Sequence, residues 1–255
     1  MVHLLTIGYR GAAYAGWQRQ PNAVTVQQRV EEAVLALTGQ SAAVVAAGRT
    51  DAGVHARAQA AHVELQEEWP RGALVHGVNH HLPSDIRIHD ARRMREGFHA
   101  RKHALWKEYR YRTIRCEVLS PLDEPTAIRV DPDLDLARLA RATELLPGRH
   151  DFSAFALAGG AHRDPRRTLF EAEWREAGDE LTLRLRGDGF LRGMVRSLAG
   201  TLLEVARGRR SVEDVARLLE GGERREAGPT APPQALVLWR VEHDAVWAAP
   251  AAVLD

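Results

Sequence analysis

The order of its apolar segments constrains this chain more than any other feature of the sequence. Short apolar runs predict strands, whereas apolar residues three and four apart predict helices. Thr25 can cap one such helical pattern, and Pro70 can open the other. The first hundred residues therefore predict, in order, a strand, a helix, two strands, a helix and a strand, at 2–9, 25–39, 43–47, 58–65, 70–81 and 86–94.

The second half of the chain repeats this order. Strands are predicted at 105–116, 168–174, 181–185 and 236–241, with helices at 134–146 and 190–206 and an additional short helix at 212–219. The order β-α-β-β-α-β is that of a ferredoxin-like unit. We therefore predict an α+β fold of two ferredoxin-like halves, 1–103 and 104–255. The halves join edge to edge into one broad, mainly antiparallel sheet with helices on one face and a central active-site cleft, which removes two exposed sheet edges.

The composition favours a globular protein of the cytoplasm. With 255 residues, 45% of them hydrophobic, the chain can build a substantial core. It contains no run of about 18 apolar residues, so no membrane span is expected. No signal peptide precedes the first predicted strand, and the single cysteine, Cys116, cannot form an internal disulfide.

Positive charge is concentrated in the middle of the chain, although the net charge is only +1. Between Arg87 and Arg115, ten lysine or arginine residues stand against three acidic residues, a local excess of seven charges. Eight of the ten are arginine, whose planar guanidinium suits phosphate binding and base stacking. We interpret this segment as a basic patch suited to nucleic acid.

A short charged stretch, Gly48–Ala56, lies between two of the predicted strands. It reads Gly-Arg-Thr-Asp-Ala-Gly-Val-His-Ala and places Arg49 and Asp51 on a loop held by strands. Reactive side chains are often presented on such loops. The alternative is an ordinary turn, in which aspartate caps the backbone and Gly53 supplies a positive φ.

The common cofactor and nucleophile motifs are missing from the sequence. It has neither the Gly-Lys-Ser/Thr of a phosphate-binding loop nor a Gly-x-Ser-x-Gly elbow, and Gly187–Gly189 lacks the dinucleotide-binding spacing. His76 and His80 have helical spacing but no nearby cysteine or carboxylate partners of the kind that zinc sites use. We therefore expect neither a cofactor nor a metal ion.

Aromatic residues and arginines alternate on the predicted strand at 105–116. Tyr109 and Tyr111 point to one side of it and the arginines to the other. The strand is either half buried with one solvated face, or a surface on which an RNA base stacks. Arg196 lies beside apolar residues of a predicted helix, where an arginine needs a carboxylate partner. That ion pair is either purely structural or part of a functional site.

Together these residues resemble the tRNA pseudouridine synthase A (TruA) family. The resemblance is carried by Gly48–Ala56 and runs collinearly through nearly the whole chain. It implies a cofactor-independent isomerase that converts uridine to pseudouridine in the tRNA anticodon stem-loop, at positions 38, 39 and 40 of tRNA, as a homodimer. The other matching blocks are Gly16–Gln20, Asn79–Ile86, Phe98–Arg101, Lys107–Tyr111, Asp151–Phe155, Phe190–Arg196 and Thr230–Leu236.

The resemblance also assigns roles to site residues. It implies that Asp51 is the catalytic nucleophile and that Tyr109 packs on the target base. Arg196 matches the basic residue that pairs with the aspartate, and Arg49 matches the arginine that fills the space left by the flipped nucleotide. The carboxylate can attack C6 of the base or C1′ of the sugar, or act as a base, and the sequence leaves these routes open.

Two other functions fit parts of the pattern. A non-catalytic RNA-binding protein of two ferredoxin-like units would use the same basic strands and Tyr109, but binding alone does not require Asp51 near RNA phosphates. An Asp-dependent hydrolase would need a second carboxylate, which the central stretch lacks. Gly193, Ala235 and Trp106 depart from the residues usual in the family, and they affect only the expected substrate contacts.

Overall fold

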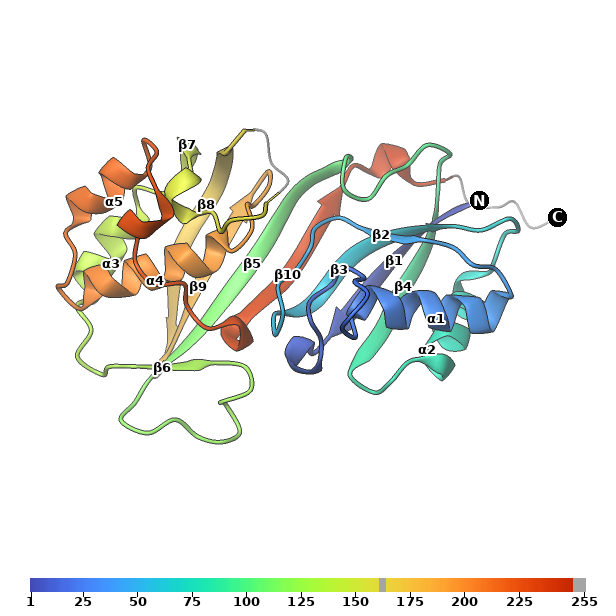
Figure 1. Cartoon of the computed structure of the whole chain (residues 1–255), viewed down its shortest axis with the longest axis horizontal. Helices are drawn as coiled ribbons and strands as arrows, with labels where there is room; N and C mark the ends of the chain where they lie inside the picture. Colours follow the sequence, from blue (N-terminus) through green and yellow to red (C-terminus); the bar gives the residue numbers. More distant parts are fainter. Residues whose placement is uncertain (161–163, 250–255) are drawn as a thin grey trace. The chain divides into compact units, whose positions relative to one another are not determined.

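The chain divides into two compact units in a computed structural model that describes residues 1–160 and 164–249 (Figure 1). Among the described residues, the first unit comprises 1–105 and 238–249, and the second comprises 106–160 and 164–237. The described residues form ten strands, paired mainly antiparallel, together with helices, which confirms the predicted α+β class. Among them, no helix combines the length and the apolar character that crossing a membrane requires.

The first unit has the predicted β-α-β-β-α-β order. Its sheet has the strand order β4-β1-β3-β10, and the short β2 also pairs with β3. The elements are β1 (Val2–Tyr9), α1 (Val26–Thr38), β2 (Val44–Ala46), β3 (His55–Glu64), the π-helical turn η2 (Ala73–Gly77) that continues into α2 (Val78–His81), β4 (Ile86–Met94) and β10 (Leu236–His243).

Local signals determine the ends of α1. The Thr25 side chain accepts a hydrogen bond from the main-chain N–H of Gln28, as expected of an N-cap. Gly39 follows the helix with a φ of 70°, and its N–H donates to the Leu35 carbonyl. Both ends therefore agree with the prediction from sequence.

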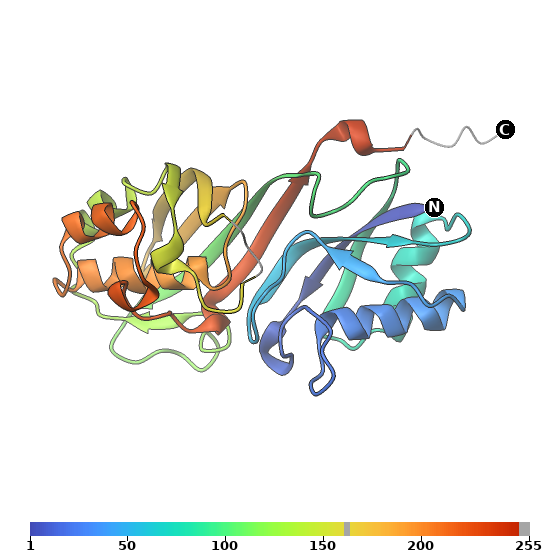
Figure 2. The ribbon, with the colours of Figure 1, turned by 45° about the horizontal axis from the view of Figure 1, so that its top comes forward.

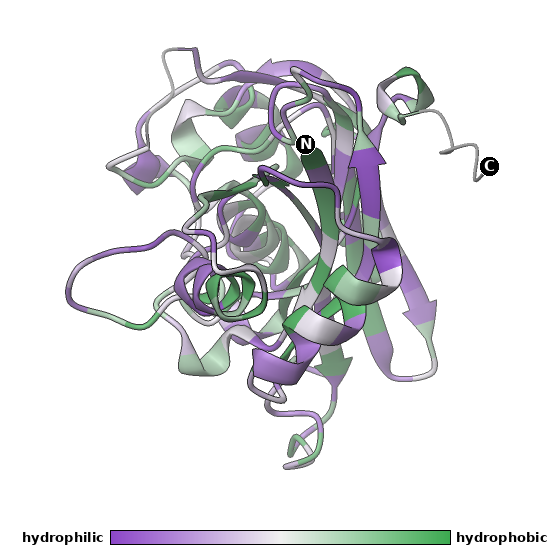
Figure 3. Cartoon of the chain, turned by 90° about the vertical axis from the view of Figure 1, so that its right-hand side faces the viewer, coloured by the Kyte–Doolittle hydropathy of each residue, from purple (hydrophilic) through white to green (hydrophobic). Residues whose placement is uncertain are grey.

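Strand β1 is buried on both of its faces. Leu5 and Ile7 are fully buried, and Leu4 on the opposite face belongs to a cluster with Phe98 that Trp247 partly covers. The strand that begins at the N-terminus is accordingly coloured as hydrophobic along most of its length in Figure 3. Because β1 is central to this unit, its C-terminal end is a rigid support for neighbouring loops.

The second unit combines a four-stranded antiparallel path, β5-β9-β8-β7, with a short strand, β6, that is parallel to β5. Helices α3, α4 and α5 pack together on one face of this sheet (Figure 2). The elements are β5 (Ala104–Arg115), β6 (Ile128–Val130), α3 (Leu136–Thr143), β7 (Gly148–Asp151), β8 (Arg166–Ala177), β9 (Glu180–Gly187), α4 (Met194–Ala206) and α5 (Val212–Leu218).

The main differences from the predicted strands are two additional short strands and an earlier start of β3. Strands β6 and β7 were not predicted, because three or four residues are too few to show a period. Strand β3 begins at His55, earlier than predicted, because Ala56 still pairs with Tyr9 of β1.

The C-terminal segment lies in the first unit, whereas the predicted second half, 104–255, included it. Strand β10 is a neighbour of β3, and beyond it the main-chain N–H of Arg95 donates to the Trp247 carbonyl at 2.9 Å. The ring of His103 also stacks on Trp247, with centroids 3.8 Å apart. These long-range contacts, which periodicity does not encode, decide where the segment packs.

Candidate active site

Asp51 lies in a loop between β2 and β3. Its main-chain carbonyl accepts a hydrogen bond from the N–H of Val54 at 3.2 Å, and Gly53 has a φ of 78°. Residues 51–54 thus form a turn that needs glycine at its third position. Main-chain atoms close this turn, so the turn does not require the Asp51 side chain. The stretch can therefore be an ordinary turn and still present a functional aspartate. Asp51 is half buried, and Arg49 is exposed.

The loop is tied to the segment that connects β1 to α1. The main-chain N–H of Trp17 donates to the Thr50 carbonyl at 3.1 Å, and the N–H of Gly53 donates to the Tyr14 carbonyl at 3.4 Å. The main chain is therefore held on both sides of Asp51 by the same neighbouring segment.

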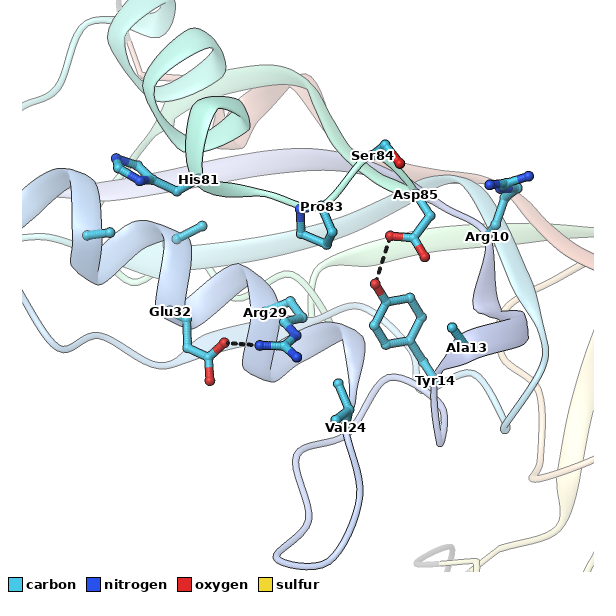
Figure 4. A pocket seen from close by; sticks show the side chains of 12 residues that line it. Arg10, Ala13, Tyr14, Val24, Arg29, Glu32, His81, Pro83, Ser84 and Asp85 are labelled. Carbon is cyan, nitrogen blue, oxygen red and sulfur yellow. Dashed lines mark hydrogen bonds and ion pairs between the residues drawn. The ribbon is translucent and has the colours of Figure 1, made fainter.

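A pocket of about 740 Å³ lies beside this segment in the first unit (Figure 4). The hydroxyl of Tyr14 donates to Oδ1 of Asp85 at 2.8 Å across this pocket. Burial and this hydrogen bond raise the pKa of Tyr14 to about 12. Tyr14 is thus fixed through its side chain by Asp85 and through its carbonyl by Gly53, so the pocket wall and the Asp51 turn are connected.

Tyr109 and Tyr111 lie on one buried face of β5, as the alternation predicts. Tyr111 is fully buried, its hydroxyl donates to the Pro232 carbonyl at 2.9 Å, and burial raises its pKa. The ring of Tyr109 meets Phe190 edge to face, with centroids 4.9 Å apart and planes at 75°. The two tyrosines therefore differ, since the Tyr111 hydroxyl joins two segments of the second unit and the Tyr109 ring is oriented by an aromatic neighbour.

The arginines on the other face of β5 are paired with carboxylates. Arg110 contacts Glu108 at 2.8 Å. At least five of the ten basic residues between 87 and 115 form such ion pairs, so folding partly neutralises the basic patch that the sequence predicts. The other pairs are Arg92 with Asp90, Arg93 with Glu68, Arg112 with Asp123 and Glu180, and Arg115 with Glu176.

Arg196 lies in the first turn of α4 and is half buried. Its Nε donates to the Ala231 carbonyl at 2.7 Å, and its own carbonyl accepts from the N–H of Ala231 at 3.1 Å. Its charge lowers the pKa of Tyr111, against the larger effect of burial. Arg196 is thus held to a neighbouring segment of the second unit, and its pairing with Asp51 stays a prediction.

Comparison with known proteins decides the family. The model of a family described as tRNA pseudouridine synthase matches residues 6–101 and 142–244. The chain belongs to the tRNA pseudouridine synthase family. Three relatives named tRNA pseudouridine synthase A come from Syntrophotalea carbinolica (46% identical, covering 94% of this chain and 95% of the relative), Geobacter sp. (42%, 93% and 96%) and Neisseria gonorrhoeae (40%, 94% and 91%).

Membership of this family confirms the resemblance seen in the sequence, and makes the chain a pseudouridine-forming isomerase with tRNA as the implied substrate. Arg49 and Asp51 lie in the first matched range and Arg196 lies in the second, whereas Tyr109 falls between them. Among solved structures, a Cbf5–Nop10–Gar1 complex contains a chain that is 12% identical, with a TM-score of 0.36. That alignment covers 92% of this chain and 48% of the other, and the likeness is too weak to support an argument.

The predicted site residues of this pseudouridine synthase are divided between its units. Arg49 and Asp51 share one loop of the first unit, and Tyr109 and Arg196 lie in the second. Sequence reasoning missed Gln59, whose Nε2 donates to the Gly48 carbonyl at 2.7 Å, although an amide inside an apolar run was a signal. Within the described residues, no group of three histidine, cysteine or acidic side chains is placed to hold a metal ion.

Proposed function

We propose that this pseudouridine synthase converts uridine to pseudouridine in the tRNA anticodon stem-loop, at positions 38, 39 and 40, with Asp51 as the nucleophile. The carrying observation is a half-buried carboxylate on a turn that main-chain hydrogen bonds hold on both sides. The relatives named tRNA pseudouridine synthase A, which align over nearly their whole length, support the reaction.

The reaction needs no oxidant and no second substrate. The glycosidic C–N bond breaks, the uracil turns, and a bond forms from C1′ to C5, from which a proton leaves while N1 gains one. An ionised carboxylate can assist by attack on C6 or C1′, with a covalent intermediate, or by acting as a base on the sugar. All three routes place the Asp51 carboxylate at the base or its sugar.

The other site residues prepare the base for reaction. The uridine must leave its stack, which costs a few kcal/mol. Tyr109 packs on the extruded base, and such stacking is worth about 1–3 kcal/mol. The exposed Arg49, two residues before Asp51, occupies the space that the nucleotide leaves, and Arg196 is the basic residue that the family resemblance pairs with the aspartate.

We assign the enzyme to the cytoplasm as a homodimer. Cys116 is a free thiol, which suits a reducing compartment. The homodimer comes from the family resemblance, and sedimentation equilibrium tests it: a single species with the mass of one 28.3 kDa chain would contradict it.

Release of tritium from tRNA labelled at uridine C5 tests the reaction, because the new bond replaces that hydrogen. We expect release by the wild type and by Asp133→Ala, which removes an exposed carboxylate elsewhere, and none by Asp51→Ala. tRNAs labelled singly at positions 38, 39 and 40 test the site. Release by Asp51→Ala would remove Asp51 as nucleophile, and salt-sensitive binding without any release would favour a binding protein.

A further inference from the structure

Two buried side chains of the first unit, Tyr9 and Gln59, contact the part of the loop that comes just before Asp51. The hydroxyl of Tyr9, at the end of β1, is 2.8 Å from Oγ1 of Thr50. Nε2 of Gln59, from β3, donates to the Gly48 carbonyl at 2.7 Å. Tyr9, Thr50 and Gln59 are 4%, 6% and 0% exposed. We call these three residues, with the Gly48 carbonyl, the loop support.

Two of the three residues of the loop support come from neighbouring strands of the sheet. Strands β1 and β3 are antiparallel neighbours, and Gln59 pairs with Ile7, two residues before Tyr9. The support fixes the chain at Gly48 and at Thr50, the residue immediately before Asp51.

These contacts are hydrogen bonds, so they fix the positions of particular atoms as well as filling space. An apolar side chain would fill the same space, but it would not fix the position of a hydroxyl or a carbonyl. A buried polar group that is paired favours one arrangement, because leaving either partner unpaired is unfavourable. This holds for the Tyr9 and Thr50 hydroxyls and for Nε2 of Gln59, whereas Oε1 of Gln59 has no hydrogen-bond partner among the described residues. Burial also raises the pKa of Tyr9 to about 12, even though Thr50 and Gln59 favour its phenolate. Its hydroxyl therefore stays protonated under working conditions.

We propose that Tyr9, Thr50 and Gln59 are positioning residues of this synthase, which hold the main chain at Gly48–Thr50 so that the Asp51 carboxylate meets the reacting uridine. The role rests on the proposed function of Asp51. All three residues are at most 6% exposed, so we expect them to act through the loop and not through contact with the RNA. Their loss therefore lowers the rate at saturating tRNA and leaves tRNA affinity intact.

Thr50→Val and Thr50→Ser form the central test, since valine keeps the shape of threonine and serine keeps its hydroxyl. We expect Thr50→Val to lower kcat at least tenfold with KM for tRNA within twofold, and Thr50→Ser to recover kcat to within threefold of the wild type. Tyr9→Phe removes the other half of the pair and behaves like Thr50→Val. The double variant is no slower than the slower single variant, because both remove one interaction.

Thr143→Val is the matched control. Thr143 is equally buried, on α3 of the second unit, and its hydroxyl donates to the Leu139 carbonyl at 2.7 Å. We expect Thr143→Val to lower thermal stability about as much as Thr50→Val but to leave kcat unchanged. The comparison therefore distinguishes a loss of positioning from a general loss of stability. Should Thr50→Val not fold, Tyr9→Phe carries the same comparison.

The outcomes distinguish this inference from the proposed function. Wild-type kcat in Thr50→Val and Tyr9→Phe, with Asp51→Ala inactive, would overturn the positioning role alone. Turnover by Asp51→Ala would overturn the nucleophile and the positioning role together. A raised KM with unchanged kcat in Thr50→Val would place the loop support in RNA binding and overturn the inference as well.

Discussion

Gly16 lies against the main chain of Thr50, so that a Cβ atom at Gly16 would be 2.6 Å from the Thr50 carbonyl oxygen. Its φ of +92° is also one that residues with a side chain rarely adopt. The loop that carries Asp51 therefore depends on a residue that has no side chain.

Gly16→Ala should both destabilise the enzyme and displace the Asp51 loop. Backbone strain alone costs about 1–3 kcal/mol at such a position. We expect a lower free energy of unfolding in urea, together with a fall in kcat at a temperature where the variant is folded. Gly39→Ala serves as the control, because Gly39 also has a positive φ but a Cβ atom added there would meet no neighbouring atom within 4 Å. It should lose stability without losing kcat, and wild-type kcat in Gly16→Ala would contradict the dependence.

Tyr109 and Tyr111 should separate catalysis from folding. Tyr111→Phe leaves the Pro232 carbonyl without its donor, so we expect a loss of about 1–2 kcal/mol in the free energy of unfolding and little change in kcat. Tyr109→Ala should lower single-turnover rates by tenfold or more, because the extruded base loses its stacking partner. Rapid-quench measurement of tritium release checks both, and equal rate losses in the two variants would refute the distinction.

Gly200→Ala should disrupt the second unit. A Cβ atom at this position of α4 would overlap the carbonyl oxygen of Pro229, which is main chain and cannot rotate away. We expect a loss of about 3 kcal/mol in the free energy of unfolding. Gly72→Ala is the matched change in an open helical position, where alanine adds about 0.5–1 kcal/mol of stability. Thermal denaturation of both variants tests the contrast, and equal stability would be inconsistent with this packing.

His3 should make the first unit less stable in acid. Burial lowers its pKa below the ordinary value of 6.5, and the nearby N-terminal amino group and Arg93 act in the same direction while Glu68 opposes them. As pH falls below 6.5, the unfolded chain takes up a proton that the folded protein does not. The free energy of unfolding therefore falls until pH passes the lowered pKa.

His3→Leu tests this titration, because the Nε2 of His3 has no hydrogen-bond partner among the described residues. Urea unfolding between pH 7.5 and 5 should show a smaller loss of stability in His3→Leu than in the wild type. Some loss remains, since burial also lowers the pKa of His62 and of His99. Identical pH profiles would exclude the contribution of His3.

Elements whose signals are local could be predicted from the sequence. The ends of α1 follow from Thr25 and Gly39, and the strand β1 follows from a segment that is mostly apolar. The charged stretch around Asp51 stood out because it interrupts apolar strands. In each case the neighbours that decide the structure lie within a few residues along the chain, so the pattern itself contains the answer.

By itself, the sequence determined the order of the longer strands and helices, the loop that bears Asp51 and the family to which the chain belongs. Only the tertiary structure decided which distant groups meet. Thr50 rests on Tyr9, 41 residues away, and Tyr111 donates to Pro232, 121 residues away. The periodicity of apolar residues predicts which side chains are buried. Their hydrogen-bond partners depend on which strands become neighbours, and packing over the whole unit decides this.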